Sequence, residues 1–100
     1  MNPKQRRENT RTIGEAIREL VEAYHLDNKL IETKIINAWP EVSGTYISRQ
    51  THKLYINDHV LYVVIHSSVI KHELHLAHDD LLEQLNSIAG KAYLKKIVFV

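Results

Sequence analysis

The residues of this chain best suited to chemistry are its histidines. Four of the seven histidines lie between residues 66 and 78, and His72, His75 and Asp79 follow at spacings of three and four. On one continuous helix these side chains share a face, where they could ligate a divalent metal. A tight site usually needs three or four ligands with supporting hydrogen bonds, and the sequence fixes no other ligand nearby. We therefore expect no metal and no other cofactor, and interpret this as a solvated face whose protonation below about pH 6.5 strengthens contact with nucleic acid.

Positively charged residues are the second group of candidates. Residues 1–11 hold four basic residues against Glu8 alone, and Met1 is the only apolar residue among the first ten. We interpret residues 1–11 as a flexible basic arm that seeks phosphates, because cations near a polyanion release its counterions on binding. The alternative is an ordinary solvated terminus. Charge and strand facing select these candidate nucleic-acid contacts: Arg6, Arg7, Arg11, Lys53, Tyr55, Tyr62, Lys95 and Lys96.

Length and composition exclude several classes of protein. The chain has 100 residues, 13 basic and 12 acidic side chains, and no cysteine. This length fits one domain with one core, and the lack of cysteine excludes disulfides, thiolate metal sites and a cysteine nucleophile. No apolar run approaches the roughly 18 residues of a membrane span and no signal peptide opens the chain, so we expect a cytoplasmic module. Nucleophile-elbow, phosphate-loop and dinucleotide motifs are missing, and we expect no enzymatic activity.

A first helix is expected to begin near Thr12. The segment from Thr12 to Glu15 fits a capping box, in which the hydroxyl and the carboxylate satisfy free amides at the helix start. A 3.6-residue apolar stripe then runs through Ile13, Ala16, Ile17, Leu20, Val21 and Tyr24. The pattern is typical of an amphipathic helix.

A second helix is expected after Asp27, which is a plausible N-cap. Pro40 lacks an amide N–H and disfavours helical geometry at Trp39, so the helix should end or kink there. Trp39 should pack in the core with its indole N–H satisfied. Gly44 should serve the backbone turn that follows, since glycine takes positive φ freely. A short further turn is expected around Tyr46.

From Thr51 the apolar period changes to two, which predicts a hairpin. The turn lies at Asn57-Asp58 or Asp58-His59, and the second strand runs over 60–66. Either turn puts the same residues on one face: Lys53, Tyr55, Val60, Tyr62, Val64 and His66. Ser67-Ser68 then caps one long helix, which ends at a C-cap on Gly90. The last strand covers 94–100.

These elements give the order α-α-β-β-α-β. A strand, a helix and a strand make a crossover, and the helix must cover one face of the sheet. We predict an α+β fold, a two-layer α/β sandwich with a three-stranded sheet, as a single domain over residues 12–100. The other sheet face is then open and carries tyrosines suited to base stacking or to a protein interface. The alternative is that an early helix folds over this face and buries it.

Residues spread over most of the chain follow, in order and spacing, the pattern of a known protein family. They are Ala38-Trp39-Pro40-Glu41-Val42-Ser43-Gly44, Ile47, Thr51, Leu61, Val63, Ile65, Ser67-Ser68, Glu73-Leu74, Leu85-Asn86, Gly90 and Ile97. In order and spacing they resemble the DciA-like family over about residues 13–100. The resemblance implies a KH-like domain that acts with the bacterial replicative helicase and helps it engage DNA when replication begins.

The sequence departs from that family in places. Ile70 stands where members often have an aromatic residue, and the sequence stops at Val100 whereas many members extend well beyond the domain. If contacts to helicase or DNA use those extensions, this chain binds more weakly or differently. It also lacks the Gly-x-x-Gly loop that a standard KH domain uses to grip a nucleotide backbone.

Three functions are compatible with these patterns. The leading hypothesis is a non-enzymatic DNA-replication accessory protein that binds the replicative DNA helicase and, weakly, single-stranded or forked DNA. The second is a protein-protein adaptor without nucleic-acid binding, using the open sheet face or the strand edge at Val98 and Val100. The third is a general RNA-binding KH-like module, which competition between RNA and DNA would separate from the first.

Overall fold

The structure is a computed structural model that describes the backbone of residues 3–23 and 26–100, and the side chains of 12–23 and 27–100. The chain divides into two compact units, residues 1–30 and 31–100. In chain order the elements are α1 (Pro3–Ala23), α2 (Leu26–Ser43), α3 (Thr45–Gln50), β1 (Thr51–Asn57), β2 (Val60–Ile65), α4 (Ser68–Leu76), α5 (His78–Ala89) and β3 (Lys96–Phe99).

Helix α1 dominates the first unit. The predicted apolar stripe lies on it from Ile13 to Val21, with Ile13, Ile17 and Leu20 exposed by 64%, 59% and 51%, while Tyr24 lies outside the described residues. The prediction that the helix begins at Thr12 is wrong, because α1 already begins at Pro3. Residues 4–8 are strong helix formers, and proline suits the first position of a helix. Helix propensity therefore extends α1 through the segment that we expected to be a flexible basic arm. Its flexibility and its role in binding stay predictions.

Helix α2 leads into the second unit and carries part of its core. Ile35 and Trp39 lie one turn apart and are 0% and 1% exposed. The helix does not end at Trp39 but continues through Pro40, where the missing N–H affects only the last turn. Gly44 has φ 92° and donates its N–H to the carbonyl of Pro40 at 3.0 Å, which ends the helix as predicted for this glycine. The expected further turn is α3.

Strands β1 and β2 form the predicted antiparallel hairpin. Asn57 pairs with Val60, so Asp58 and His59 make the turn, which is one of the two predicted positions. Both turn residues have positive φ, 51° and 63°, as a type I′ turn requires. The register confirms the predicted alternation, because the residues between those of the predicted outer face point to the core: Leu54, Ile56, Leu61, Val63 and Ile65.

The long helix predicted after the hairpin is instead two helices, α4 and α5. Ser67 confirms the predicted N-cap, since its Oγ accepts a hydrogen bond from the N–H of Ile70 at 3.3 Å. Ala77 leaves helical geometry, with φ −96° and ψ 7°, although no glycine or proline marks the break. Asp79 and the next aspartate then occupy the first turn of α5, where carboxylates favour a helix start. Gly90, at φ 82°, is the predicted C-cap.

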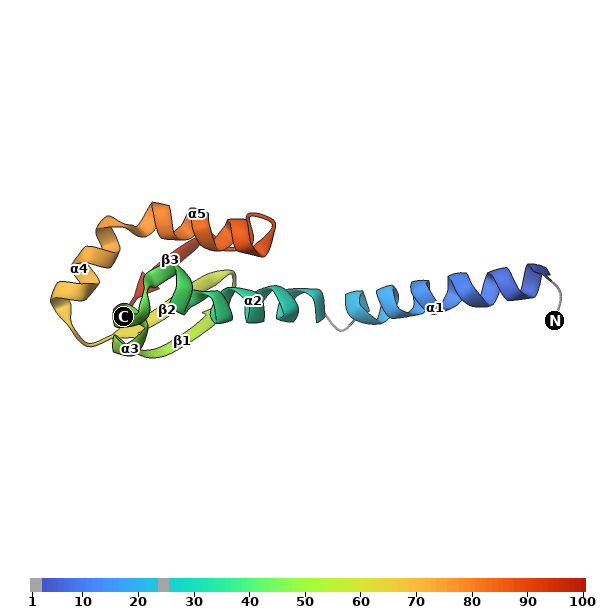
Figure 1. Ribbon diagram of the computed structural model, residues 1–100, viewed down its shortest axis with the longest axis horizontal. Coiled ribbons are helices and arrows are strands. Elements are labelled where there is room, and N and C mark those ends of the chain that lie inside the picture. The colour runs from blue at the N-terminus through green and yellow to red at the C-terminus, as the bar shows by residue number, and fades with distance from the viewer. Residues whose placement is uncertain (1–2, 24–25) are drawn as a thin grey trace. The chain divides into compact units, whose positions relative to one another are not determined.

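Strand β3 pairs in parallel with β2 and completes a sheet of order β1-β2-β3. Buried side chains from α2, α4 and α5 and from the inward face of the sheet form one core cluster. Figure 1 shows α4 and α5 on one side of the sheet. The helices that fill this core therefore cover the same sheet face, which confirms the two-layer α+β fold. The predicted α-α-β-β-α-β order holds, with the last helix in two segments.

Candidate nucleic-acid interface

The sheet face opposite the core carries a pair of stacked tyrosines. Tyr55 of β1 and Tyr62 of β2 are directly paired across the strands. Their rings stack with centroids 4.9 Å apart and an interplanar angle of 10°. Tyr55 is 37% exposed and Tyr62 is half-buried, so within residues 31–100 no element buries both rings. The alternative that the first helix covers this face stays a prediction. An aromatic platform lies on this side of the sheet.

Lys53 extends this platform toward the start of β1. Its Nζ lies 5.0 Å from the centroid of the Tyr55 ring, within the range of a cation–π interaction. Lys53 is exposed and pairs across the strands with Val64, which is half-buried on the same face. The tyrosine ring thus holds the lysine stem near the sheet while the charge remains in water.

A pair of histidines continues the same surface at the end of the hairpin distant from its turn. The rings of His52 and His66 lie 4.7 Å apart and are tilted by 56°, and both residues are exposed. A β-bulge explains this placement, because the register shifts between Thr51 and Lys53 and leaves His52 as the extra residue. The sequence predicted the facing of His66 but could not show the bulge or the ring contact.

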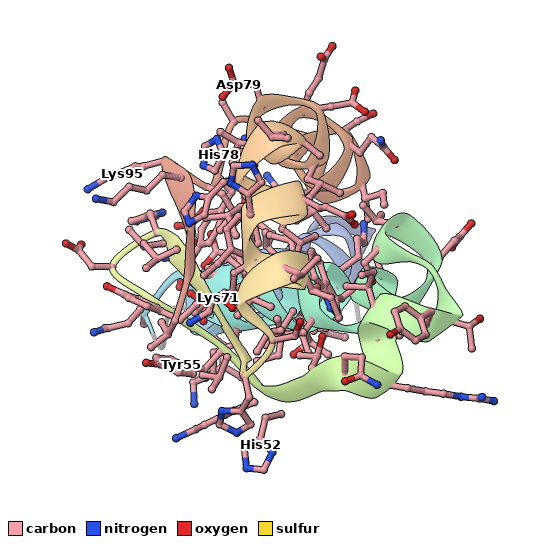
Figure 2. The ribbon with its side chains drawn as sticks, turned by 90° about the vertical axis from the view of Figure 1, so that its left-hand side faces the viewer. His52, Tyr55, Lys71, His78, Asp79 and Lys95 are labelled. Atoms are coloured by element: carbon pink, nitrogen blue, oxygen red, sulfur yellow. The ribbon has the colours of Figure 1, made fainter. Side chains whose placement is uncertain are left out.

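Two further lysines lie at the start of β3. Lys96 is exposed and pairs with Val60 of β2. Two residues further along the same pair of strands, Val98 pairs with Tyr62. Lys95 is exposed and its backbone N–H donates to the carbonyl of His59 at 2.8 Å. In Figure 2, Tyr55 and Lys95 project to the same side of the ribbon, away from α4 and α5. We define the outer sheet face as His52, Lys53, Tyr55, Val60, Tyr62, Val64, His66, Lys96 and Val98.

Charge is segregated between the two layers of the second unit. In the sequence no acidic residue occurs over 42–57, 59–72 or 91–100, which include all three strands. The helices hold the other acids of this unit: Glu32, Glu41, Glu73, Asp79, Asp80 and Glu83. The exposed Asp58 in the hairpin turn is the exception. The sheet side is therefore the electropositive side of the unit.

The structure brings five of the eight predicted contact residues to the sheet side: Lys53, Tyr55, Tyr62, Lys95 and Lys96. The other three are Arg6, Arg7 and Arg11, whose side chains lie outside the described residues. Their backbone belongs to α1. Their role in binding stays a prediction.

The candidate metal group is not assembled. Among the described residues, no group of three or more histidine, cysteine or acidic side chains could hold a metal ion. The prediction that His72, His75 and Asp79 share one helical face is wrong, because α4 ends at Leu76, before Asp79. The ring of His75 instead makes a T-shaped contact with the ring of Phe99, with centroids 5.1 Å apart.

His78 has a structural role that sequence reasoning missed. Its Nε2 accepts the backbone N–H of Ile97 at 3.0 Å, and its Nδ1 lies 2.9 Å from the carboxylate of Asp79. These two contacts define a neutral imidazole that carries its proton on Nδ1 and gives strand β3 a partner for its outer edge. No sequence signal separates His78 from the exposed histidines nearby.

Two more hydrogen-bonded groups fix the segment that leads into β3. Asn86 donates to the carbonyl of Leu94 at 3.1 Å and accepts its N–H at 2.9 Å. The hydroxyl of Tyr93 donates to Glu32 of α2 at 2.5 Å, and the Tyr93 carbonyl lies 3.0 Å from His59 Nδ1. These contacts position Lys95 and Lys96 relative to the hairpin.

The predicted core role of Trp39 is also confirmed in detail. Its indole N–H donates to the hydroxyl of Thr51 at 3.0 Å, and that hydroxyl donates to the carbonyl of Ile47 at 2.8 Å. Trp39 therefore ties α2 to the junction of α3 and β1. This junction lies immediately before the bulge that sets His52 and Lys53.

Fold and surface together define a class: a small two-layer α+β domain with a basic, imidazole-bearing and aromatic face on its sheet. The family described as Dna[CI] antecedent, DciA, matches residues 12–99. The chain therefore belongs to the DciA family, and this membership implies a role in DNA replication related to helicase loading. No curated protein and no solved structure matches the chain. Among the described helices, none combines the length and the apolar character needed to cross a membrane.

Proposed function

We propose that this chain is a non-enzymatic accessory protein of DNA replication that binds the replicative helicase and, weakly, single-stranded or forked DNA. Family membership supports the helicase as a partner. The outer sheet face supports DNA, because stacked tyrosines, lysines and imidazoles lie together on it. The observation that carries the DNA part is the exposed Tyr55–Tyr62 stack beside Lys53.

The tyrosine pair offers a base a flat surface to stack on. Stacking on an aromatic side chain contributes about 1–3 kcal/mol per base and tolerates any sequence, since every base has a π-face. Duplex DNA hides these faces, so the platform favours single strands or the open part of a fork. This preference suits a protein that acts where a helicase is loaded.

The cations around the platform suit the sugar-phosphate backbone. Lys53 lies on one side of the tyrosines, and Lys96 lies on β3 on the other. Each phosphate contact adds a counterion-release contribution, which makes affinity fall as salt rises. We propose that Arg6, Arg7 and Arg11 add to this counterion-release contribution to the affinity. With so few lysines on the face, we expect weak binding at physiological salt.

The KH-like description remains part of this proposal. Two helices between β2 and β3 support it. The α4–α5 junction contains Ala77 and His78 and no glycine, so it offers no Gly-x-x-Gly clamp. We therefore propose that nucleic acid binds on the outer sheet face rather than at this junction.

Fluorescence anisotropy with a labelled single strand at low and at higher salt tests the DNA part. Wild type should bind, and affinity should fall as salt rises. The variant Tyr55→Ala should weaken binding, whereas Lys34→Gln on α2 is the control for a cation that does not belong to the outer sheet face. Absence of binding at low salt would leave the protein adaptor as the better function, and tighter binding of RNA than of DNA in competition would favour the RNA module.

Pull-down with the cognate replicative helicase tests the partner. The full chain should retain the helicase, and the comparison with a chain lacking residues 1–11 shows whether the N-terminal segment takes part. No retention by the full chain contradicts the helicase part of the proposal, whatever the DNA experiment gives.

A further inference from the structure

The two histidines in contact on the outer sheet face have no structural task in the described unit. The rings of His52 and His66 lie 4.7 Å apart, and both residues are exposed. The other histidines with described surroundings in this unit mostly pack against the fold. His59 contacts Tyr93, and His75 and His78 contact Phe99. The His52–His66 pair is thus left free to contact a ligand.

The β-bulge at His52 brings the rings of His52 and His66 together. Without the bulge, the strict alternation of a strand would point His52 inward, to the face that carries Leu54 and Ile65. The extra residue lets Thr51 face the core, where it binds Trp39, while both His52 and Lys53 remain exposed. Bulges commonly re-aim a side chain next to a functional site. Figure 2 shows His52 at the lower end of the molecule, with Tyr55 on the left.

Basic side chains outnumber acidic ones in the elements that adjoin the pair in the chain. The titratable and charged residues of the elements leading into it are Tyr46 and Arg49 of α3, Lys53 and Tyr55 of β1, Tyr62 of β2, and Lys71, His72, Glu73 and His75 of α4. The single acid among them, Glu73, lies roughly 8 Å along the axis from the start of α4. Asp58 is six residues from His52, or roughly 20 Å of strand away.

This setting determines which ligand would suit the pair. A protonated imidazole here adds to the positive charge of Lys53, and residues 51–57 and 60–66 hold no acidic side chain to compensate it. An incoming phosphate group supplies the missing negative charge and accepts hydrogen bonds from the protonated rings. We propose that His52 and His66 form a phosphate-binding pair for the nucleic-acid backbone, which takes up a proton from solvent when the strand binds.

This inference rests on the proposed binding of single-stranded DNA, and it makes a distinct prediction. Proton uptake links affinity to pH, so that affinity rises by up to about tenfold for each pH unit lowered when one proton is taken up. Lysine and tyrosine side chains ordinarily titrate near pH 10, whereas histidine side chains ordinarily titrate near pH 6.5, within about one unit of neutrality. The pH dependence between pH 8 and pH 6 therefore reports on the histidines.

The test measures affinity of the full chain for a labelled single strand at fixed salt between pH 8 and pH 6. Wild type should bind several-fold more tightly at pH 6, and the double variant His52→Gln/His66→Gln should lose most of that change. His72→Gln, an exposed histidine of α4, is the matched control and should keep the wild-type slope. Calorimetry in two buffers of different ionisation enthalpy should show proton uptake by wild type but not by the double variant.

The outcomes separate this inference from the proposed function. Binding by wild type without pH dependence, or an equal dependence in the double variant, overturns the phosphate-binding pair and leaves the DNA proposal standing. Loss of the dependence in His72→Gln instead would assign it to α4 and also overturn the pair. No binding at any pH overturns both proposals. Unchanged thermal unfolding of the variants at pH 7 shows that they remain folded.

Discussion

The two faces of the sheet come from the same strands and have opposite properties. The inward face is filled by aliphatic side chains such as Leu61 and Val63, both 0% exposed, which join the core with the helices. The outer face, from neighbouring positions, presents Tyr55 and Lys53. One residue of displacement along a strand thus separates a side chain that stabilises the fold from one that is available for contact. Changes on the two faces should therefore separate stability from binding.

The largest effect is expected from Leu61→Ala on the inward face. Removing a fully buried leucine side chain leaves a cavity, and such changes lower the free energy of unfolding by about 2–5 kcal/mol. Urea unfolding monitored by circular dichroism measures this loss. The outer-face variant Tyr55→Ala is the comparison and should lose distinctly less. Equal losses in the two variants would mean that the outer face is packed as tightly as the core.

A smaller loss of stability is expected from Asn86→Ala. The side chain makes two hydrogen bonds to the backbone of Leu94, and leaving these groups unpaired costs about 1–3 kcal/mol. Gln84→Ala on the exposed side of α5 is the control and should change stability by less than about 0.5 kcal/mol. Hydrogen exchange of the amides of residues 93–97 should also accelerate in Asn86→Ala. Unaltered exchange there would show that Asn86 does not hold this segment.

On the outer face, the largest loss of DNA affinity is expected from Tyr55→Ala. Loss of one stacked base lowers affinity for single-stranded DNA by about 1–3 kcal/mol, or roughly fivefold to 150-fold. Anisotropy titration at low salt measures it, and Tyr55→Phe should restore most of the affinity because the ring remains. If the alanine variant binds as wild type does, bases do not stack on this platform.

The smallest expected effect is that of Lys53→Gln. One lost phosphate contact should reduce the slope of log affinity against log salt by roughly 0.7, the value for single strands. Lys34→Gln removes the same charge from α2 and should leave the slope closer to that of wild type. Identical slopes for the two variants would indicate only a diffuse effect of net charge, with no local contact at Lys53.

The sequence was most informative where periodicity is strict. Alternation over the hairpin predicted both faces of the sheet, because a slip of one residue would exchange Leu54 and Tyr55. It was less informative about helix ends. The start of α1 depends on helix propensity in a charged segment that has no apolar stripe. The break at Ala77 depends on packing and on the two aspartates that follow it in the first turn of α5.

The candidate site was predictable in part for the same reason. Lys53, Tyr55 and Tyr62 follow from alternation alone. The contact between His52 and His66 depends on a bulge, which adds one residue to a strand without a glycine or proline to mark it. The hydrogen bonds of His78 and Asn86 join residues 19 and 8 positions apart that share no element, and helix or strand periodicity carries no information about such pairs.

The hairpin turn has one further consequence. Asp58 and His59 both adopt positive φ, although neither is the glycine that would do so without steric penalty. His59 also holds Tyr93, whose hydroxyl reaches Glu32 on α2. A glycine at position 59 would relax the backbone and at the same time release the tip of the ribbon from the rest of the unit. The unfavourable backbone conformation at His59 is therefore accompanied by a hydrogen bond that fixes the end of the hairpin to the rest of the unit.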